Sequence, residues 1–470
     1  MNIKILFRDI RFWIFFFFVI RLIGITDPPL EIGHNWRQST VTMVARNFLE
    51  VDNNIFFPRI DIAGEKTGIT GMEFPLFNYL IYLVAKIFGY QHWYGRLINL
   101  LVSCVGLWFF YKLTGKYFTR QTAFNATIIL TVSIWFQFSR KIMPDTFSMS
   151  LILASIYYGS NYLDNTSRKY ALIHLIFYGF LMMLGTLSKL PSAFLLVVFA
   201  VFVFNRGIPV KRKIVFFVVS FIGLLPVVLW YYYWVPYLVE ELGFLHFFMG
   251  KSISQGFGEI FQNLNETLEK FYETAIKFIA FALFIYGLAL SFVKNDRKIY
   301  LIFILTFISF LIIIFKAGHT FAYHSYYIVP FVPVMALIAG YGLSSIRNSK
   351  LAIILLIALS VEGIANQQHD FRIKDKDKEL LSLEDDLNKV SLPDDLILIN
   401  SGEYPTPMYF AHRKGWVNSN EQIRDTNYIE SLKDKGLKFV VILKKSFGNE
   451  ISLSSYKKVF ENEDYCIYEL

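Results

Sequence analysis

The sequence has 470 residues, of which 55% are hydrophobic and 18% aromatic, and its formal net charge is +9. Apolar runs of about 15–22 residues recur to about residue 366, which excludes an ordinary soluble protein and indicates a polytopic membrane protein. Lys and Arg cluster in the short gaps between these runs, and no basic stretch is interleaved with aromatic residues in a soluble segment, which argues against nucleic acid as a partner.

The first apolar run determines how the membrane topology begins, and the two cysteines add no constraint to the fold. Cys104 and Cys466 do not indicate a disulfide framework. Residues 12–26 follow a cluster of cations and lack a small-residue cleavage site, so we interpret them as a span rather than a signal peptide. The positive-inside rule then places the N-terminus in the cytoplasm and residues 27–74 outside, as a first outer loop. Apolar positions within residues 39–50 predict a short helix along the membrane surface.

Residues 75–89 are apolar but short for a span. If they crossed the membrane, Lys112, Lys116 and Arg120 would lie outside, so we interpret them as an interfacial helix. The following spans are expected at 93–111, 122–139, 147–163, 171–187, 191–204, 214–234, 274–293, 299–315, 326–346 and 351–366. With the first run, they make about eleven spans and a transmembrane domain over residues 1–366.

The composition changes at residues 367–470, which are charged and contain the strand-like runs 395–400 and 438–443. Segments near 377–390 and 427–435 are expected to be helical. The predicted fold class is therefore an all-α polytopic membrane protein with a small α/β domain at the C-terminus. With eleven spans, that domain faces the extracytoplasmic side of the cytoplasmic membrane, and the absence of an internal repeat disfavours an inverted-repeat transporter.

Under this topology, ionisable side chains from distant segments converge on the outer face. They are His34, Arg37, Gln38 and Glu73 in the first loop, Arg140, Lys141 and Asp145 in the next, Lys189 in the third, and Lys316, His319, His324, Tyr326 and Tyr327 in a later turn. A carboxylate there can take a proton from a hydroxyl group, and Lys or Arg can hold a phosphate. A lipid-linked phosphate would lie at that depth.

Each of these residues also has a purely structural interpretation. Lys189 and Arg21 are able to snorkel from helix ends, and Arg140 and Lys141, which fall outside against the positive-inside rule, are able to anchor the interface. Asp145 is suited to cap the following helix, and Glu73 to start one, while His319 and His324 match ordinary surface histidines. No single residue is decisive, but their predicted location on the same face of the membrane favours a functional site.

Five stretches carry a family resemblance. They are VARNFLE at 44–50, EFPLFNYLIYLVAKIFG at 73–89 with the following Arg96, IMPDTFSMSLIL at 142–153, LGTLSKLPSAFLLV at 184–197 and HSYYIVPFVPVMALIAG at 324–340. Over about residues 10–345 the chain resembles the C-type (GT-C) glycosyltransferases. It is most similar to the bacterial branch related to protein O-mannosyltransferases and lipid A aminoarabinose transferases.

The resemblance implies transfer of a sugar from a polyprenyl-phosphate donor to a hydroxyl of a lipid, glycan or protein acceptor, usually with inversion. It also implies that Asp145 matches the acidic residue of the second outer loop and that Lys189 contacts the donor phosphate. One departure stands out. Family members usually carry an acidic residue about nine positions before the Arg of VARNF, where this chain has Arg37-Gln38 in HNWRQ.

The usual base is thus missing, so Glu73 or Asp145 takes the role, or His34 does, or the site is inactive; we favour a carboxylate. Arg37 and Arg140 are expected beside the donor phosphate with Lys189. Substrate contacts are expected from His34, Gln38, His319, His324 and Tyr327. No metal is required by a monophosphate leaving group held by fixed cations, although a divalent metal held by His34 and acids stays possible.

Two rival classes remain. A transporter or flippase would place ionisable residues near mid-membrane, whereas the charges here lie at segment ends, apart from Arg21. A polysaccharide polymerase or ligase would place its largest outer loop late in the chain, where residues 235–273 are only a moderate stretch.

Overall fold

The computed structural model describes residues 6–164, 170–203, 205–243, 250–448, 451 and 453–470. The chain forms two compact units, each drawn from three stretches of sequence. Unit 1 contains Met1–Ile25, Arg96–Tyr232 and Phe248–Gln368, and unit 2 contains Thr26–Gly95, Tyr233–Phe247 and His369–Leu470. The last change of unit comes after Gln368, and residues 26–95 group with the C-terminal region.

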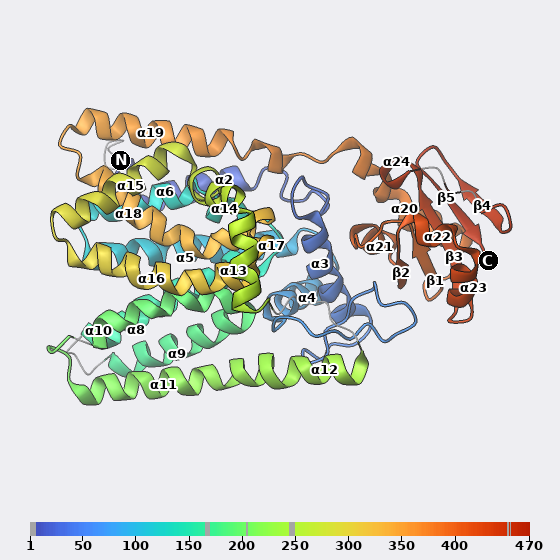
Figure 1. Ribbon diagram of the computed structural model, residues 1–470, viewed down its shortest axis with the longest axis horizontal. Helices are drawn as coiled ribbons and strands as arrows, with labels where there is room; N and C mark the ends of the chain where they lie inside the picture. The colour runs from blue at the N-terminus through green and yellow to red at the C-terminus, as the bar shows by residue number, and fades with distance from the viewer. Residues whose placement is uncertain (1–5, 165–169, 204, 244–249, 449–450, 452) are drawn as a thin grey trace. The chain divides into compact units, whose positions relative to one another are not determined.

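Unit 1 is built from helices, several of which run roughly parallel in Figure 1. Its first half contains α2 (Ile10–Arg21), α5 (Tyr94–Tyr117), α6 (Arg120–Thr131), α7 (Ile134–Gln137), η1 (Phe138–Arg140), α8 (Pro144–Asp164), α9 (Ala171–Ser188), η2 (Leu190–Phe199), α10 (Ala200–Val203), α11 (Val210–Leu229) and η3 (Trp230–Trp234). Its second half contains α13 (Ile253–Gln262), α14 (Leu264–Glu269), η4 (Lys270–Ala275), α15 (Lys277–Val293), α16 (Arg297–Ala317), α17 (His319–Tyr323), η5 (Ser325–Phe331), α18 (Val332–Ser344) and α19 (Ser349–Ala365).

Helices occupy all eleven ranges in which spans were predicted. Among the described residues, five helices are long and apolar enough to cross a membrane: α5, α9, the continuous stretch Val210–Leu242, α16 and Ser325–Ser344. The number rises to seven if each of two bent helix pairs is one span. The chain is therefore a multipass membrane protein by length and composition, and the count of eleven stays a prediction.

The first bent pair turns by 52° between α6 and α7. The bend has an identifiable cause, because Ser133 leaves the helix and its hydroxyl accepts from the backbone N–H of Trp135 at 3.2 Å. Gln367 then donates to the Val132 carbonyl at 2.7 Å, and Arg21 donates to Gln367. This buried polar contact satisfies a carbonyl that the bend frees from the helix, as apolar surroundings require.

Small residues let the helices of unit 1 approach closely. A Cβ added to Gly287 of α15 would lie 2.2 Å from the Ile338 carbonyl oxygen of α18, and one added to Gly340 would lie 2.5 Å from the backbone nitrogen of Ala126 in α6. Van der Waals packing at such contacts is the main force between helices in a membrane, because lipid supplies no hydrophobic drive.

Unit 2 combines three helices, α3 (Asn35–Glu50), α4 (Leu76–Phe88) and α12 (Val235–Leu242), with the C-terminal region. That region contains η6 (Gln368–Phe371), η7 (Asp375–Ser382), α20 (Leu383–Val390), β1 (Leu396–Ile399), α21 (Thr406–Ala411), β2 (Gly415–Val417), α22 (Asn420–Arg424), α23 (Thr426–Lys433), β3 (Leu437–Leu443), α24 (Lys444–Phe447), β4 (Lys457–Glu461) and β5 (Tyr465–Glu469). The strands at β1 and β3 coincide with the runs predicted at 395–400 and 438–443.

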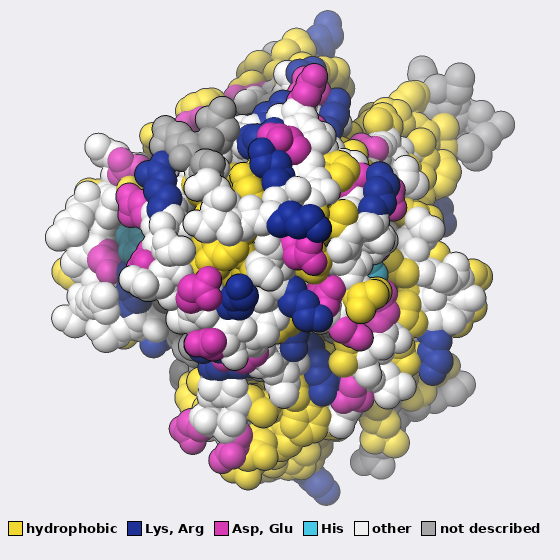
Figure 2. All heavy atoms as spheres, turned by 90° about the vertical axis from the view of Figure 1, so that its right-hand side faces the viewer, with side chains coloured by type: hydrophobic (Ala, Val, Ile, Leu, Met, Phe, Trp, Pro, Cys, Tyr) yellow, Lys and Arg dark blue, Asp and Glu magenta, His cyan; other side chains and the backbone are white. Residues whose placement is uncertain are grey.

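The five strands form one sheet in the order β2-β1-β3-β5-β4. β1 pairs parallel with β2 and with β3, where Ile399 lies opposite Val441, and β5 is antiparallel to β3 and β4. The central strands β1 and β3 are apolar on both faces because both faces are covered. Ile397 and Ile399 pack in a core with residues of α3, whereas Leu398 packs with α22 and α23. The face in Figure 2 carries Lys, Arg, Asp and Glu side chains interspersed, as suits a surface in water.

The two helices predicted in the first outer loop are present. α4 spans Leu76–Phe88 within the predicted range 75–89, and Phe77, Ile81 and Ala85 form its buried face. α3 begins earlier than residue 39, at Asn35, and every residue from Arg37 to Phe48 is buried. A helix covered all round is packed within protein, so its apolar spacing reflects a core position rather than a one-sided surface position.

Candidate active site

The clearest site in unit 1 lies where α8 begins and α9 ends. Pro144 starts α8 and places Asp145 in its first turn, where a negative charge is favoured by the helix dipole. Lys189 has extended backbone between α9 and η2. Its Nζ lies 4.0 Å from Oδ1 of the buried Asp145 carboxylate. One turn along α8, Ser148 donates to the Gly185 carbonyl at 2.7 Å, which fixes the end of α9 against α8.

Aromatic side chains from η5 complete this cluster. The Lys189 ammonium lies 5.9 Å from the Tyr326 ring centroid, within the range of a cation–π contact. Tyr326 stacks on His324 at 5.5 Å and lies 4.6 Å from Tyr327. Burial lowers the pKa of His324, and the nearby positive charges of Lys270 and His319 lower it further. His324 is therefore a neutral imidazole at physiological pH, and Lys270 is a further cation near the cluster.

Asn99, in the second turn of α5, fixes the turn that precedes Asp145. Its side-chain nitrogen lies 3.1, 2.9 and 3.1 Å from the backbone carbonyl oxygens of Phe138, Lys141 and Met143. Its side-chain oxygen accepts from the Thr146 hydroxyl at 3.0 Å. Asn99 is fully buried, so this turn is held from inside the helix bundle.

Arg140 and Lys141 are both buried within this turn. Arg140 donates to the carbonyl oxygen of Gly24 at 3.0 Å, and the Lys141 ammonium lies 5.7 Å from the Phe138 ring. These two cations are thus integrated into the fold rather than extended along an exposed interface. Two cations buried next to a carboxylate make the turn electropositive.

His319 belongs to a separate cluster of unit 1. Its Nδ1 lies 2.6 Å from Lys251 Nζ and 3.1 Å from Glu259 Oε2, and its backbone N–H donates to the same carboxylate at 2.9 Å. Hydrogen bonding from Lys251 lowers the pKa of Glu259 to about 2. His319 on α17 is thus bound to Glu259 on α13, and this ion pair joins the two helices.

The first-loop candidates lie in unit 2. Arg37 and Glu73 form a buried ion pair, so the Arg that stands in place of the usual acid is joined to one of the two candidate carboxylates. Gln38 donates to the buried Glu31 at 3.4 Å. His34 precedes α3 with a left-handed backbone, φ 59°. From the C-terminal region, Tyr404 donates to Asn35.

The structure thus brings the sequence candidates together in three groups. Asp145, Lys189, His324 and Tyr327 share one cluster, Arg37 pairs with Glu73, and His319 pairs with Glu259. Sequence reasoning missed Asn99, Lys270 and Tyr404. Asn99 had one available signal, because a polar amide inside an apolar span requires a partner. Among the described residues, no group of three or more His, Cys, Asp or Glu side chains is placed to hold a metal ion.

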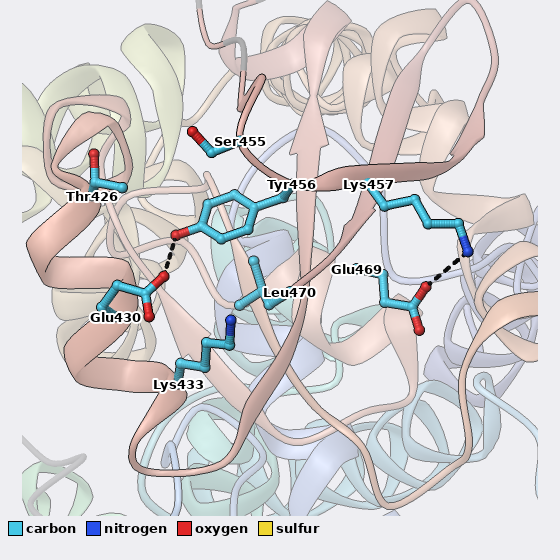
Figure 3. Close-up of a pocket in the computed structure, with 8 residues that line it drawn as sticks. All are labelled: Thr426, Glu430, Lys433, Ser455, Tyr456, Lys457, Glu469 and Leu470. Atoms are coloured by element: carbon cyan, nitrogen blue, oxygen red, sulfur yellow. Dashed lines mark hydrogen bonds and ion pairs between the residues drawn. The ribbon is translucent and has the colours of Figure 1, made fainter.

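A cavity of about 510 Å³ lies away from these residues, on the C-terminal part of unit 2. It is lined by Thr426, Glu430, Lys433, Ser455, Tyr456, Lys457, Glu469 and Leu470 (Figure 3). The Tyr456 hydroxyl donates to Glu430 at 2.8 Å, and Lys457 pairs with Glu469 at 3.4 Å. The charged groups in it are therefore largely matched with one another.

Residues 73–233, which include Glu73, Asp145 and Lys189, match the family described as dolichyl-phosphate-mannose-protein mannosyltransferase. ArnT from Cupriavidus metallidurans, solved with bound undecaprenyl phosphate, superposes with a TM-score of 0.60 at 11% identity over 97% of this chain and 98% of ArnT. The chain has the fold of the GT-C glycosyltransferases. The family resemblance seen in the sequence is confirmed at that level.

Two other GT-C enzymes are similar over most of this chain. The oligosaccharyltransferase AglB from Archaeoglobus fulgidus, in complex with an inhibitory peptide and a dolichol-phosphate, has a TM-score of 0.55 at 14% identity, over 92% of this chain and 69% of AglB. The mycobacterial arabinofuranosyltransferase AftD has a TM-score of 0.57 at 11% identity, over 98% of this chain and 40% of AftD. No curated protein matches the sequence.

Proposed function

We propose that the chain transfers a sugar from a polyprenyl-phosphate donor to a hydroxyl of a lipid, glycan or protein acceptor, with inversion, at the outer face of the cytoplasmic membrane. The observation that carries this proposal is the contact between Asp145 and Lys189, 4.0 Å apart at the adjoining ends of α8 and α9. A carboxylate and a cation side by side supply the two groups that sugar transfer from a phosphate needs.

The bond changes assign a role to each charge. The acceptor oxygen forms a bond to the anomeric carbon while the bond from that carbon to the phosphate oxygen breaks. The polyprenyl phosphate leaves with the bonding electrons, and the acceptor proton passes to a carboxylate. Lys189 balances the charge that develops on the leaving phosphate, and Tyr326 holds the ammonium from one side.

Asp145 and Glu73 are the candidate bases, and His34 is the alternative. Asp145 is suited to the role because its buried carboxylate lies beside the Lys189 ammonium, 4.0 Å away, so that base and phosphate-binding cation stand together. Glu73 is bonded to Arg37. A carboxylate held by a guanidinium is a weaker base, so Glu73 is better suited to orient the acceptor than to deprotonate it.

Arg37 and Arg140 are proposed to face the donor phosphate with Lys189, and Lys270 is added to this set by its charge near His324. His34, Gln38, His324 and Tyr327 are proposed to contact substrate. His319 is the least suited of the predicted contacts, because Glu259 and Lys251 already bind it. The undecaprenyl phosphate bound by ArnT and the dolichol-phosphate bound by AglB support a polyprenyl-phosphate donor.

Radiolabelled undecaprenyl-phosphate mannose and undecaprenyl-phosphate arabinose, supplied to membranes that contain the full chain, test the proposal. Label should pass to an acceptor, and Asp145→Asn should slow transfer by about a hundredfold or more, the usual range for a general base. Asp164→Asn is the matched control, because Asp164 ends the same helix and pairs with Lys116 at 3.0 Å. Transfer at the wild-type rate by both Asp145→Asn and Glu73→Gln would reject a carboxylate base.

A further inference from the structure

A second cavity, of about 410 Å³, lies at the junction of α3 and α4 in unit 2. It is lined by Phe48, Leu49, Val51, Asp52, Asn53, Tyr82 and Lys86. No residue of this set belongs to the candidate active site. From the cavity and its surroundings we infer a binding site for a membrane phospholipid, recognised through its phosphate group.

Hydrogen-bond donors gather on one side of the cavity. The Asn53 side chain donates to the Tyr82 phenol oxygen at 3.3 Å, and the Lys86 ammonium lies 5.7 Å from the Tyr82 ring centroid. Hydrogen bonding from Asn53, and then from Lys86, lowers the pKa of Tyr82. The phenol oxygen accepts from Asn53, which leaves the phenol hydrogen as a donor for a ligand in the cavity. An amide, a phenol and an ammonium together match the oxygens of a phosphate.

The net charge of the lining also favours an anion. Asp52 is the one acid of the cavity wall, and it pairs with Arg59 at 3.0 Å. Its pKa is lowered by that hydrogen bond, so it is ionised and its charge is matched by the guanidinium. The ammonium of Lys86 therefore leaves the cavity with an excess of positive charge.

Apolar side chains flank these donors. Leu83, Ile87 and Phe88 on α4 are 41%, 74% and 72% exposed, and Val51 in the cavity wall is 62% exposed. On α4 the buried positions Phe77, Ile81 and Ala85 form the opposite face. An amphipathic helix of this kind lies in the headgroup region with its apolar face toward acyl chains.

The position in the chain brings this surface to a membrane. Only residues 89–93 separate α4 from Tyr94, where the candidate span α5 begins. Six peptide units reach at most roughly 20 Å, so Phe88 stays near the membrane edge whichever way the linker runs. A ligand with a phosphate beside Lys86 and acyl chains against Leu83 and Ile87 is therefore a bilayer phospholipid. This inference does not depend on the proposed sugar transfer.

The test uses the purified, delipidated full chain in detergent, with phosphatidylglycerol titrated and bound lipid counted by native mass spectrometry. Lys86→Gln should weaken phosphatidylglycerol binding about tenfold, the loss expected for one charge-assisted hydrogen bond. Lys433→Gln is the matched control, because Lys433 also lies 5.7 Å from a tyrosine ring, that of Tyr456, and the charge change is identical. Its binding should equal that of the wild type.

Three probes separate the sources of the phosphate. Glucosyl-diacylglycerol, which has acyl chains but no phosphate, should bind at least tenfold more weakly than phosphatidylglycerol. Inorganic phosphate should not compete at millimolar concentration, and equal affinity for it would overturn the lipid assignment. If undecaprenyl phosphate displaced phosphatidylglycerol from the wild type but not from Lys86→Gln, the cavity would be a site for the sugar donor and the phospholipid assignment would be wrong. Equal binding of phosphatidylglycerol by Lys86→Gln and Lys433→Gln would also overturn the assignment.

Discussion

The side-chain nitrogen of Asn99 lies 2.9 Å from the backbone carbonyl oxygen of Lys141. Through this bond and two neighbouring ones, α5 holds the turn that carries Arg140 and leads into Asp145. We expect Asn99→Ala to cost about 1–3 kcal/mol of stability, because it leaves buried carbonyl groups without a donor. It should also lower kcat of sugar transfer about tenfold with a smaller change in the donor KM, since Asp145 loses its fixed position.

Asn125→Ala is the control for that experiment. Asn125 is also a buried asparagine in a helix of unit 1, and it donates to Ser344 at 3.0 Å. It should lose similar stability in a thermal melt while keeping kcat. Equal losses of kcat in the two variants would show that Asn99 acts only through general stability.

Replacing Lys189 should act mainly on the donor. We expect Lys189→Gln to raise the KM for a polyprenyl-phosphate sugar at least tenfold, because one charge-assisted hydrogen bond to phosphate is lost. Initial rates at varied donor concentration measure this. Lys116→Gln on α5 removes the same charge, but at the opposite end of α8, where Lys116 pairs with Asp164. This variant should leave the KM for the donor unchanged. A normal KM in Lys189→Gln would remove Lys189 from the donor site.

Two glycines of α13 offer a paired test of packing. A Cβ on Gly256 would lie 1.6 Å from the Phe315 carbonyl oxygen, whereas one on Gly258 would meet nothing within 4 Å. Gly256→Ala should therefore destabilise the protein by about 1–3 kcal/mol, because backbone must move. Gly258→Ala should be neutral or stabilise by up to about 1 kcal/mol through helix propensity. The melting temperatures of both variants, measured in the same detergent, test this prediction. Equal shifts of the two melting temperatures would contradict the close contact of α13 with α16.

His412 predicts a pH dependence of unit 2. Its Nδ1 lies 2.6 Å from Glu384 and its Nε2 lies 2.8 Å from Glu50, and the hydrogen bonds that it donates to these two carboxylates raise its pKa to about 9. The pKa of His412 in the folded protein lies above the ordinary value of 6.5. Its ion pairs therefore stabilise the fold fully below pH 6.5, and this stabilisation is lost as pH rises through about 9.

Thermal melts of the wild type between pH 6 and 10 should therefore show stability falling between pH 6.5 and about 9, as the imidazolium loses its proton. His412→Asn keeps a residue that tolerates the left-handed backbone of this position, φ 48°, and removes the titration. Its melting temperature should vary less over the same range. An unchanged slope in the variant would assign the effect to another group.

The local elements of unit 1 were accessible from sequence because apolar length and the positions of cations follow directly from the bilayer. The adjacency of Asp145 and Lys189 was within reach for the same reason, since a shared membrane face limits where both side chains lie. The pairing of Arg37 with Glu73 was not, because nothing local distinguishes it from the expected contact of Arg37 with a phosphate.

α3 shows most clearly where sequence reasoning ended. Its spacing of Val41, Val44, Ala45 and Phe48 suggested a membrane-surface helix, yet all four side chains are buried. Ser39 hydrogen-bonds Thr406 at 2.9 Å, and the Arg46 guanidinium lies 4.7 Å over the Tyr409 ring. Both partners come from more than 350 residues later in the chain. Periodicity reports which face of a helix is covered, but it carries no information about a covering segment so distant.

That distance has a consequence for biogenesis. Met43, Val44 and Phe48 share one core with Ile397, Ile399 and Val441, so this face of α3 stays uncovered until the strands that carry these residues have been synthesised and have joined it. During insertion into the membrane, the opening segment of unit 2 is therefore a vulnerable intermediate, exposed to proteases and dependent on chaperones. A stop codon just before β5 removes Tyr465 and Ile467 from this core and leaves β4 without its partner strand, so it should deplete the protein from cells.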